Sequence, residues 1–459
     1  MKRFPQFSLQ STVQGISWPA ITSPTAAAHL AMQYQLEQTQ WLDSSTILDR
    51  QLQQLDHIFS HACRHVPFYG NRCKNLLREK PGKLSWDFWR TLPLLTRDDI
   101  QNAANTLKST SIPPQHGKTF KTSTSGSTGK PVTVWNSELT LFFWRAFTLR
   151  EHFWHNRNFA DKLAAIRFVE KDAGKAPHGL TLQGWGRSTD NVLQSGPTSV
   201  LDIKSPIDQQ ACWLLTEQPQ YLLTHPTNAH ALADYFKATG KKLYNLLEVR
   251  TLGETLTAET EATCKEVWGV DVTDMYSSRE VGYIALLCPE QRQYHVQAEN
   301  VLVEILRDDG TDCLPGEVGK VVITCLHNYA SPIIRYDIGD YAEVGESCAC
   351  GRGLPVIKKI MGRIRNILTL PDGSRYWPIF NYKGLRQIVP FRQIQVLQHS
   401  LSELEVRLVA EAAVAASQET MMKEIIQKAV HYPFDIKFSY LEEIPRTRGG
   451  KYEEFISYV

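Results

Sequence analysis

The chain has 459 residues, of which 42% are hydrophobic and 21% charged, and its formal net charge is +2. Length and composition indicate an ordinary globular protein of two or three domains. The small net charge, with no long run of Lys or Arg, argues against nucleic acid and against an anionic membrane as partners, while a small acidic ligand stays open.

The N-terminal segment "MKRFPQFSLQSTVQGISWP" has two early basic residues, but polar residues and prolines interrupt it before a signal-peptide core can form. No later segment approaches the ~18 apolar residues of a transmembrane helix. We therefore expect a cytoplasmic protein without a membrane partner. The nine cysteines are an odd number spread over a large chain, which favours thiols or metal ligands over disulfides.

Helical patterning dominates residues 1–100. In "ILDRQLQQLDHIFSHACRHV" apolar residues recur at helical spacing, namely Ile47, Leu52, Leu55, Ile58 and Phe59. In "LPLLTRDDIQNAANTL" a helix is expected to start at Thr96 as N-cap, with Asp98 and Asp99 in its first turn, where carboxylates suit the helix dipole.

Between about residues 120 and 350, strand-like runs alternate with helical ones, as in "YLLTHPTNAHALADYFKATG" followed by "LLEVRTLGE". This alternation is typical of an α/β sheet. The final segment differs, because "RQIQVLQHS" and "LSELEVRLVA" alternate like paired strands, "QETMMKEIIQKAVHY" has helical periodicity at Met421, Ile425 and Ala429, and "FDIKFSYLEEI" alternates again. We expect a small two-layer β-β-α-β domain that begins near "MGRIRNIL".

The segment "TSTSGSTGKP", residues 122–131, has the residue types of a phosphate-binding loop without the spacing of a P-loop. Only two residues separate Gly126 from Gly129, Pro131 follows Lys130, and "VTVW" predicts a strand in place of a helix. Glycines allow backbone N–H groups to surround an anion, and hydroxyls and the lysine add donors and charge. A flexible, solvated turn is the alternative. The residues proposed to bind phosphate are Thr124, Ser125, Gly126, Ser127, Thr128, Gly129 and Lys130.

Further motifs follow in a fixed order: "LGETLT" at 252–257, "MYSSREVG" at 275–282, "PGEVGKVVIT", "IRYDIGDYA", "GRIRNIL" and "IPRTRGGKYEEF". With the 122–131 segment, they make nearly the whole chain resemble the adenylate-forming superfamily. Within it the chain is similar to the phenylacetate-CoA ligase-like branch, which includes capsule-biosynthesis and coenzyme-adenylating synthetases. The resemblance implies a large multi-layer α/β N-terminal domain and a small mobile α+β C-terminal domain. We expect these at 1–361 and 367–459, with a hinge at 362–366.

The resemblance also implies roles for single residues. Tyr276, followed by Ser277, would pack on adenine, and Glu280 would help to hold Mg-ATP and act in catalysis. Asp340 would bind the ribose hydroxyls, and Lys451 would be the mobile catalytic lysine. The other residues implied near the nucleotide are Gly253, Glu254, Arg335 and Arg363.

The implied reaction is attack of a carboxylate on the α-phosphorus of ATP, which gives an acyl-AMP and pyrophosphate. It needs positioning and charge neutralisation more than proton transfer, which suits a lysine, a Mg²⁺ site and a phosphate loop. The small domain would then swing about the hinge and open the acyl-AMP to a nucleophile. The expected cofactors are ATP and Mg²⁺, with coenzyme A as the favoured acceptor.

Four residues could form a metal site. Cys288 and His295 stand seven apart in "CPEQRQYH", and Cys348 and Cys350 lie in "CACGRG". Three thiolates and one imidazole can complete a closed tetrahedral zinc site with a structural role. The alternative is four unrelated, reduced residues. Some members of the resembled branch keep a Cys/His set in these places, which favours zinc.

The acyl pocket is expected around "LTHPTNAHALA", "LGETL" and "DMYSS", with Thr224, His225 and Met275 among its lining residues. His225 could equally be a satisfied core histidine. The candidate aromatic walls are Trp135, Trp144 and Trp154, although tryptophan is more often a core residue. We expect a monocarboxylic acid, aromatic or otherwise small and apolar.

Departures from the family pattern leave the acceptor open. The adenine motif reads "YSSRE", which places Arg279 where the family usually has Thr, and Ile364, Arg365 and Asn366 follow "GR" where an acid is common. The acyl group could pass to coenzyme A, a carrier protein or an amine, as in an amide ligase. A non-catalytic nucleotide- or acyl-binding protein is the alternative of another class. The chain could also form a homodimer.

Overall fold

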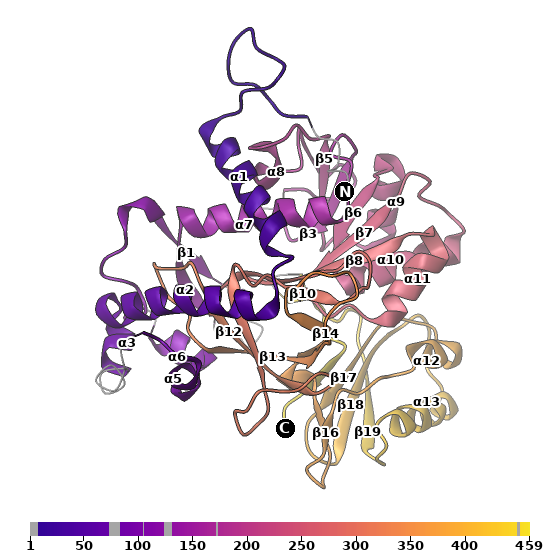
Figure 1. Ribbon diagram of the computed structural model, residues 1–459. Helices are drawn as coiled ribbons and strands as arrows, with labels where there is room; N and C mark the ends of the chain where they lie inside the picture. Colours follow the sequence, from indigo (N-terminus) through magenta and orange to yellow (C-terminus); the bar gives the residue numbers. More distant parts are fainter. Residues whose placement is uncertain (1–7, 73–82, 104, 124–130, 171–172, 448–449) are drawn as a thin grey trace. The chain divides into compact units, whose positions relative to one another are not determined.

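The computed structural model describes residues 8–72, 83–103, 105–123, 131–170, 173–447 and 450–459 (Figure 1). The chain divides into two compact units, of which the first comprises residues 1–338 and 342–360 and the second residues 339–341 and 361–459. Among the described residues, every helix is too short or too polar to cross a bilayer.

The first unit starts with helices, several of which the sequence predicted. They are α1 (Pro24–Thr39), α2 (Ser44–His65), α3 (Pro67–Arg72), α5 (Trp86–Thr91) and α6 (Arg97–Asn102), followed by the 3₁₀ turn η1 (Pro114–His116). Helix α2 buries Ile47, Leu55, Ile58 and Phe59 on one face, as its periodicity predicts. Helix α6 begins with Thr96 as N-cap in a capping box with Asp99, which confirms the predicted helix start.

One large sheet in the described part of the chain has twelve strands. Its order is β11 (Val301–Leu306), β12 (Val318–Cys325), β13 (Tyr336–Val344), β14 (Val356–Arg363), β10 (Tyr294–Val296), β9 (Gly282–Leu287), β8 (Asp271–Ser278), β7 (Glu248–Leu252), β6 (Tyr221–Thr224), β3 (Leu163–Arg167), β5 (Thr198–Asp202) and β4 (Leu180–Leu182). All of them belong to the first unit except residues 339–341 of β13 and 361–363 of β14.

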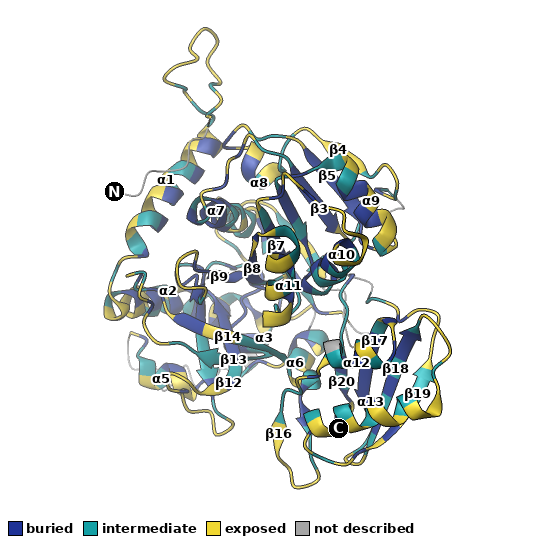
Figure 2. Cartoon of the chain, turned by 90° about the vertical axis from the view of Figure 1, so that its right-hand side faces the viewer, coloured by how far each residue is buried: buried dark blue, intermediate teal, exposed yellow. Residues whose placement is uncertain are grey.

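Five neighbouring strands of this sheet, β5, β3, β6, β7 and β8, run parallel, and β9 pairs with β8 in the opposite direction. The helices between them are α7 (Glu138–Trp154), α8 (Arg187–Asp190), α9 (Ile207–Glu217), α10 (Pro226–Thr239) and α11 (Ala258–Trp268). Helices α9 to α11 share one hydrophobic core with β3 and β6 to β8, and α7 packs with the other face of β8. Figure 2 shows β3 and β5 as buried and the outer side of α11 as exposed. The structure confirms the predicted α/β alternation.

Strands β1 (Thr119–Ser123) and β2 (Thr133–Ser137) form a separate antiparallel ribbon. Ser123 pairs with Thr133, so the segment 124–132 connects the two strands. The predicted strand after the glycine-rich segment is therefore confirmed. The predicted phosphate-binding residues Thr124, Ser125, Gly126, Ser127, Thr128, Gly129 and Lys130 lie outside the described residues.

A buried ionic network joins the end of α7 to β7. The Glu151 carboxylate lies 2.6 Å from both the Arg157 and the Arg250 guanidinium groups, and Arg157 also lies 2.7 Å from Glu248. Burial opposes ionisation of Glu151, but Arg157 and Arg250 outweigh it and hold the pKa of Glu151 well below its usual range. No periodicity in the sequence indicates this network.

The second unit is a small α+β structure. Its four-stranded sheet has the order β19 (Asp435–Tyr440), β18 (Glu403–Ala410), β17 (Phe391–Gln398) and β20 (Phe455–Ser457), with a small hairpin of β15 (Leu368–Thr369) and β16 (Arg375–Tyr376). Helices α12 (Tyr382–Ile388) and α13 (Ala416–Ala429) pack on this sheet, after the turn η2 (Ile364–Asn366). The predicted β-β-α-β order is confirmed.

Of the three residues whose periodicity indicated α13, Ile425 and Ala429 pack against the core of the second unit, and Met421 does not. Met422 and Ile426 are fully buried, whereas Met421 is 52% exposed. The doublets "MM" and "II" place an apolar residue on both candidate faces, so periodicity alone cannot choose between them. The exposed outer side of α13 is visible in Figure 2.

Candidate functional site

The predicted nucleotide and acyl residues of the first unit gather where three parallel strands end. Thr224 of β6 pairs with Thr251 of β7, and Leu252 of β7 pairs with Met275 of β8. The segments that follow β6 and β7 therefore lie beside the end of β8. In open α/β sheets, ligands bind at this carboxyl edge. The structure thus brings together residues that are 50 positions apart in the sequence.

Thr224 and His225 are both buried and hydrogen-bonded at this edge. The Thr224 hydroxyl accepts a bond from the Asn228 side chain at 3.0 Å, and His225 Nδ1 lies 2.8 Å from the Leu252 carbonyl oxygen. If Nδ1 carries the proton, the bond to Leu252 leaves Nε2 as an acceptor. The backbone contact fixes the ring orientation at the end of β6.

Gly253 and Glu254 turn the chain away after β7. Gly253 has φ of 81°, a conformation that favours glycine. The Glu254 carboxylate accepts bonds from the Thr227 backbone N–H at 3.1 Å and the Thr227 hydroxyl at 2.7 Å. Glu254 therefore caps the N-terminus of α10, where the helix dipole favours a negative charge. The role of Glu254 as a nucleotide ligand stays a prediction beside this helix-capping contact.

Met275, Tyr276 and Ser277 lie near the C-terminal end of β8. The Met275 sulfur accepts a bond from the Tyr283 hydroxyl at 3.8 Å, within a hydrophobic cluster that includes Phe147. Trp144 lies against Tyr283, with ring centroids 4.8 Å apart. A register shift between Tyr276 and Ser277 breaks the regular pairing with β9, and such irregularities re-aim side chains near binding sites.

The turn between β8 and β9 carries Arg279 and Glu280. Glu280 is only 6% exposed, and no protein hydrogen bond or ion pair is recorded for its carboxylate within the described part of the chain. Its carboxylate oxygens are not among the fully buried side-chain atoms that lack a partner, so the carboxylate is open to a cation or another donor. Arg279 donates a hydrogen bond of 2.9 Å to the Ser123 carbonyl at the end of β1. This contact ties the turn to the strand that leads into the glycine-rich segment.

The Arg335 guanidinium makes its contacts within the protein, and its predicted place near a nucleotide stays a prediction. Arg335 is 4% exposed, pairs with Glu304 at 3.0 Å, and donates to the carbonyl oxygens of Arg90 and Leu92. The guanidinium therefore links the end of α5 and Leu92 to Glu304 of β11 in the interior of the first unit. The sequence could not reveal this, because Glu304 stands 31 positions away.

Three predicted residues lie in the second unit. Arg363 Nε is 3.5 Å from the Asp340 carboxylate, which keeps a cation beside the predicted ribose ligand. Two backbone hydrogen bonds fix the backbone at Lys451. The Thr447 N–H donates to the Lys451 carbonyl oxygen at 2.8 Å, and the Gly450 N–H donates to the Thr447 carbonyl oxygen at 2.8 Å. The turn holds the Lys451 backbone independently of its side chain.

The four predicted metal ligands converge in the first unit. Cys288 follows β9, His295 lies in β10, and Cys348 and Cys350 precede β14. Their ligand atoms all lie within 4.8 Å of one another, with 3.9 Å between the sulfur atoms of Cys288 and Cys348 and 3.2 Å from Cys350 Sγ to His295 Nε2. Burial, followed by the charge of Arg352, lowers the pKa of His295 to about 4. The imidazole is therefore neutral at physiological pH, as a ligand must be.

The three candidate tryptophans have different surroundings. Trp144 lies beside Tyr283, which shares a hydrophobic cluster with Met275. Trp154 packs against His295, with ring centroids 5.8 Å apart, so it belongs to the Cys/His cluster. Trp135 lies on β2 of the separate ribbon and is contacted by two lysines. Trp154 is also a member of the hydrophobic cluster that contains Met275, so Trp144 and Trp154 both stay candidates for the acyl pocket.

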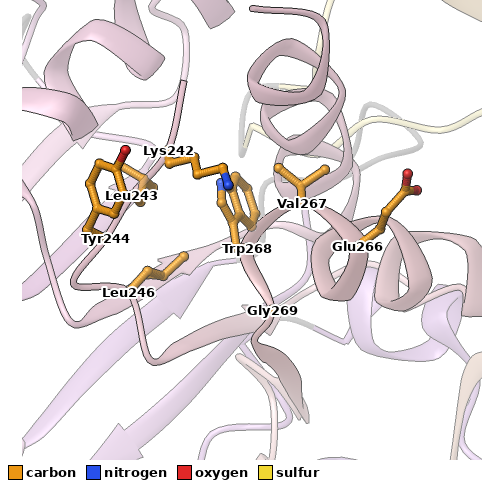
Figure 3. Close-up of a pocket in the computed structure, with 8 residues that line it drawn as sticks. All are labelled: Lys242, Leu243, Tyr244, Leu246, Glu266, Val267, Trp268 and Gly269. Atoms are coloured by element: carbon orange, nitrogen blue, oxygen red, sulfur yellow. The ribbon is translucent and has the colours of Figure 1, made fainter. Parts of the chain in front are cut away.

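A surface pocket of about 350 Å³ lies elsewhere on the first unit (Figure 3). It is formed by Lys242, Tyr244, Leu246 and Trp268 with their neighbours, which precede β7 and β8. The amino ends of these strands are opposite to the edge that carries Gly253 and Met275. This pocket is therefore separate from the candidate site.

Comparisons with known proteins agree with the predicted resemblance. The model of the CapK C-terminal domain matches residues 382–457. A phenylacetate-coenzyme A ligase of Thermus thermophilus is 28% identical over 329 residues, which cover 66% of this chain and 68% of the relative. Protein CapK of Staphylococcus aureus is 21% identical over 443 residues and 89% of each chain.

Solved structures share the fold. The crystal structure of a 2-hydroxyisobutyryl-CoA ligase in the postadenylation state covers 92% of this chain and 91% of its own, with 18% identity and a TM-score of 0.70. An anthranilate CoA ligase in complex with anthranoyl-AMP covers 72% of this chain and 64% of its own, with 16% identity and a TM-score of 0.54. The arrangement of a large α/β unit and a small C-terminal unit is thus that of adenylate-forming CoA ligases.

Proposed function

We propose that this chain, a relative of phenylacetate-coenzyme A ligases and CapK with the fold of adenylate-forming enzymes, is an ATP-dependent acid ligase. It would convert a small carboxylic acid to an acyl-AMP with release of pyrophosphate and then transfer the acyl group to the thiol of coenzyme A with release of AMP. The observation that carries the proposal is Glu280, a buried carboxylate without a recorded protein partner in the described chain, at the edge where β8 ends.

The first step joins two anions, so the site must hold charge in place. Tyr276 would pack on adenine, and Asp340 would bind the ribose hydroxyls. Glu280 fits the binding of Mg²⁺, a hard cation that takes carboxylate oxygens together with phosphates, and the ion would shield the phosphate charge. The carboxylate of the acid attacks the α-phosphorus and the bond to the β-phosphate oxygen breaks, so pyrophosphate leaves. Lys451 would stabilise the charge on the carboxylate and the α-phosphate.

The residues around Met275 support an apolar acyl group. Met275, Phe147 and Tyr283 belong to one hydrophobic cluster, and Trp144 covers Tyr283. Such walls suit an aromatic or small apolar acid. The residues 124–130 would grip the leaving pyrophosphate, and residues 362–366 would be the hinge between domains 1–361 and 367–459. A homodimer remains part of the proposal.

The Cys/His cluster fits a structural zinc ion. A tetrahedral site with Zn–S bonds of ~2.3 Å and a Zn–N bond of ~2.1 Å has ligand atoms roughly 3.7 Å apart. The 3.9 Å and 3.2 Å separations here are close to that spacing. Four protein ligands leave no open position, so the ion would hold β9, β10 and the segment before β14 together without taking part in catalysis.

Removal of one ligand tests the zinc site. We expect Cys348→Ser to abolish an equimolar zinc content and to lower the free energy of unfolding by about 3 kcal/mol or more, because metal binding contributes directly to folding. Metal analysis and thermal unfolding measure both effects. The control is Cys212→Ser, which replaces an exposed cysteine of the same unit. Wild-type protein purified without any bound metal would contradict the proposal.

Acid-dependent ATP–pyrophosphate exchange across a panel of aromatic and small aliphatic monocarboxylic acids tests the activity. Exchange with at least one acid, followed by thioester formation with coenzyme A, is the expected result. Exchange with product formed only from an amine would replace the thioester step by amide formation. Nucleotide binding without exchange would indicate a binding protein.

In the same assay, Glu280→Gln is expected to lower exchange roughly 100-fold, because the amide keeps the shape but loses the charge that faces the cation. Glu259→Gln is the matched control, since Glu259 is an exposed carboxylate on α11. A Glu280→Gln enzyme with wild-type exchange at all Mg²⁺ concentrations would exclude Glu280 from the metal site.

A further inference from the structure

The outer face of the β1–β2 ribbon presents one tryptophan between two lysines. Trp135 pairs with Lys121 across the ribbon, so both side chains lie on the same face. The Lys121 ammonium is 5.1 Å from the centre of the Trp135 ring, and the Lys108 ammonium is 3.9 Å from it. These are cation–π distances, and Trp135 is not fully buried.

No acidic side chain of the described residues forms an ion pair with these lysines. Over the part of the chain that the structure describes, no ion pair is recorded for Lys108, Lys121 or the neighbouring Lys118. Lys118 and Lys121 are exposed, and Lys108 is half-buried. Unneutralised cations around an aromatic face are suited to a ligand that has both a flat ring and negative charge.

The ribbon holds this face rigidly. The buried Asn328 side chain donates to the Trp135 carbonyl oxygen at 2.9 Å and to the Asn136 side-chain oxygen at 3.2 Å. On the opposite face, Val132 and Val134 are buried in the same hydrophobic cluster as Tyr276. The indole is therefore presented by a fixed backbone.

The same ribbon borders the candidate active site. Ser123, two residues after Lys121, accepts the hydrogen bond from Arg279, which precedes Glu280. Two residues of a strand span about 7 Å. A ligand seated on Trp135 thus lies one short ribbon away from the turn that carries Glu280, and a flexible arm of moderate length could reach the acyl group from there.

We propose that Trp135, Lys108 and Lys121 form the binding site for the 3′-phosphorylated ADP moiety of coenzyme A, an inference that rests on the proposed function. The adenine stacks on the Trp135 indole. The ammonium groups of Lys108 and Lys121 leave the face of the ring and bind the phosphates. The pantetheine arm then extends toward the β8–β9 turn with its thiol. Stacking on an aromatic side chain together with ammonium–phosphate contacts is the usual means of binding such a moiety.

The kinetic test compares the KM for coenzyme A with the KM for pantetheine, which lacks the nucleotide. Trp135→Ala is expected to raise the KM for coenzyme A about tenfold, and Trp135→Phe to restore most of it, because phenylalanine keeps a stacking surface. Lys108→Ala/Lys121→Ala should raise the KM for coenzyme A about tenfold but that for pantetheine hardly at all. Lys241→Ala/Lys242→Ala is the control, since these exposed lysines precede β7, at the opposite edge. Equal effects on coenzyme A and pantetheine would overturn the proposal.

A binding measurement tests the Trp135 site independently of the proposed ligase activity. Calorimetry with adenosine 3′,5′-bisphosphate, in the presence of excess AMP to fill the adenylate site, is expected to show one site that is lost in Trp135→Ala. Binding without any acid-dependent exchange would leave the site standing and reject the ligase activity. Exchange without bisphosphate binding, or transfer only to an amine or a carrier protein, would reject the site and leave the activity standing.

Discussion

Replacement of Lys451 by alanine is expected to lower acid-dependent ATP–pyrophosphate exchange by roughly 10³-fold while the protein stays folded. The lysine charge would be needed only as the carboxylate meets the α-phosphate, and a preorganised charge at such a point is commonly worth a factor of ~10² to 10³. The fold should tolerate the change, because the 447–451 turn is closed by backbone hydrogen bonds.

The measurement is exchange at saturating ATP and acid, beside thermal unfolding of the same samples. Lys428→Ala is the matched control, since Lys428 is an exposed lysine in the last turn of α13. The expected loss lies in the rate and not in the KM for ATP, since the charge acts in the transition state. An enzyme that loses Lys451 and keeps its exchange rate would show that another group neutralises the acid.

The second large effect concerns stability and arises in the buried ionic network. Glu151→Leu is expected to lower the free energy of unfolding by about 3–5 kcal/mol, because Arg250 is left with an uncompensated buried charge. Urea unfolding followed by tryptophan fluorescence measures the loss. The double variant Glu151→Leu/Arg250→Leu should recover part of it, since both charges are then removed.

An exposed ion pair provides the contrast. Glu266→Gln breaks the pair between Glu266 and Lys237, whose side chains are 59% and 51% exposed, and should cost at most about 1 kcal/mol. A similar small loss for Glu151→Leu would mean that Arg250 finds another partner or water. The two variants together separate burial of charge from loss of an ion pair.

The elements predicted best from the sequence are those with a local signal. Thr96 and Asp99 form a capping box within four residues, and the run from β6 through α10 to β7 alternates clearly between strand and helix patterns. The four candidate metal ligands also converge as predicted, since Cys and His are recognisable by type even at long separation. In each case the chemistry of a few residues carries the information.

Contacts between distant residues could not be predicted in this way. The motif that contains Arg335 gives no sign that its donors bond Glu304 and the carbonyl oxygens of Arg90 and Leu92 at the end of α5. Glu254 caps α10 through Thr227, a contact that depends on the parallel pairing of β6 and β7. The lysines around Trp135 also come from separate segments. A motif identifies such residues, but the packing of neighbouring strands determines what they touch.

The ends of β6, β7 and β8 have a consequence for how this enzyme can change. Each of the three strands contributes its own short segment to the site, at Thr224, Gly253 and Met275, while the Cys/His cluster is built on β9, β10 and the segment before β14. On the proposed function, we expect side-chain substitutions at these three strand ends to alter acid preference without removing a ligand of the Cys/His cluster. These three strand ends are therefore the positions that we would change first in a redesign toward a new acid.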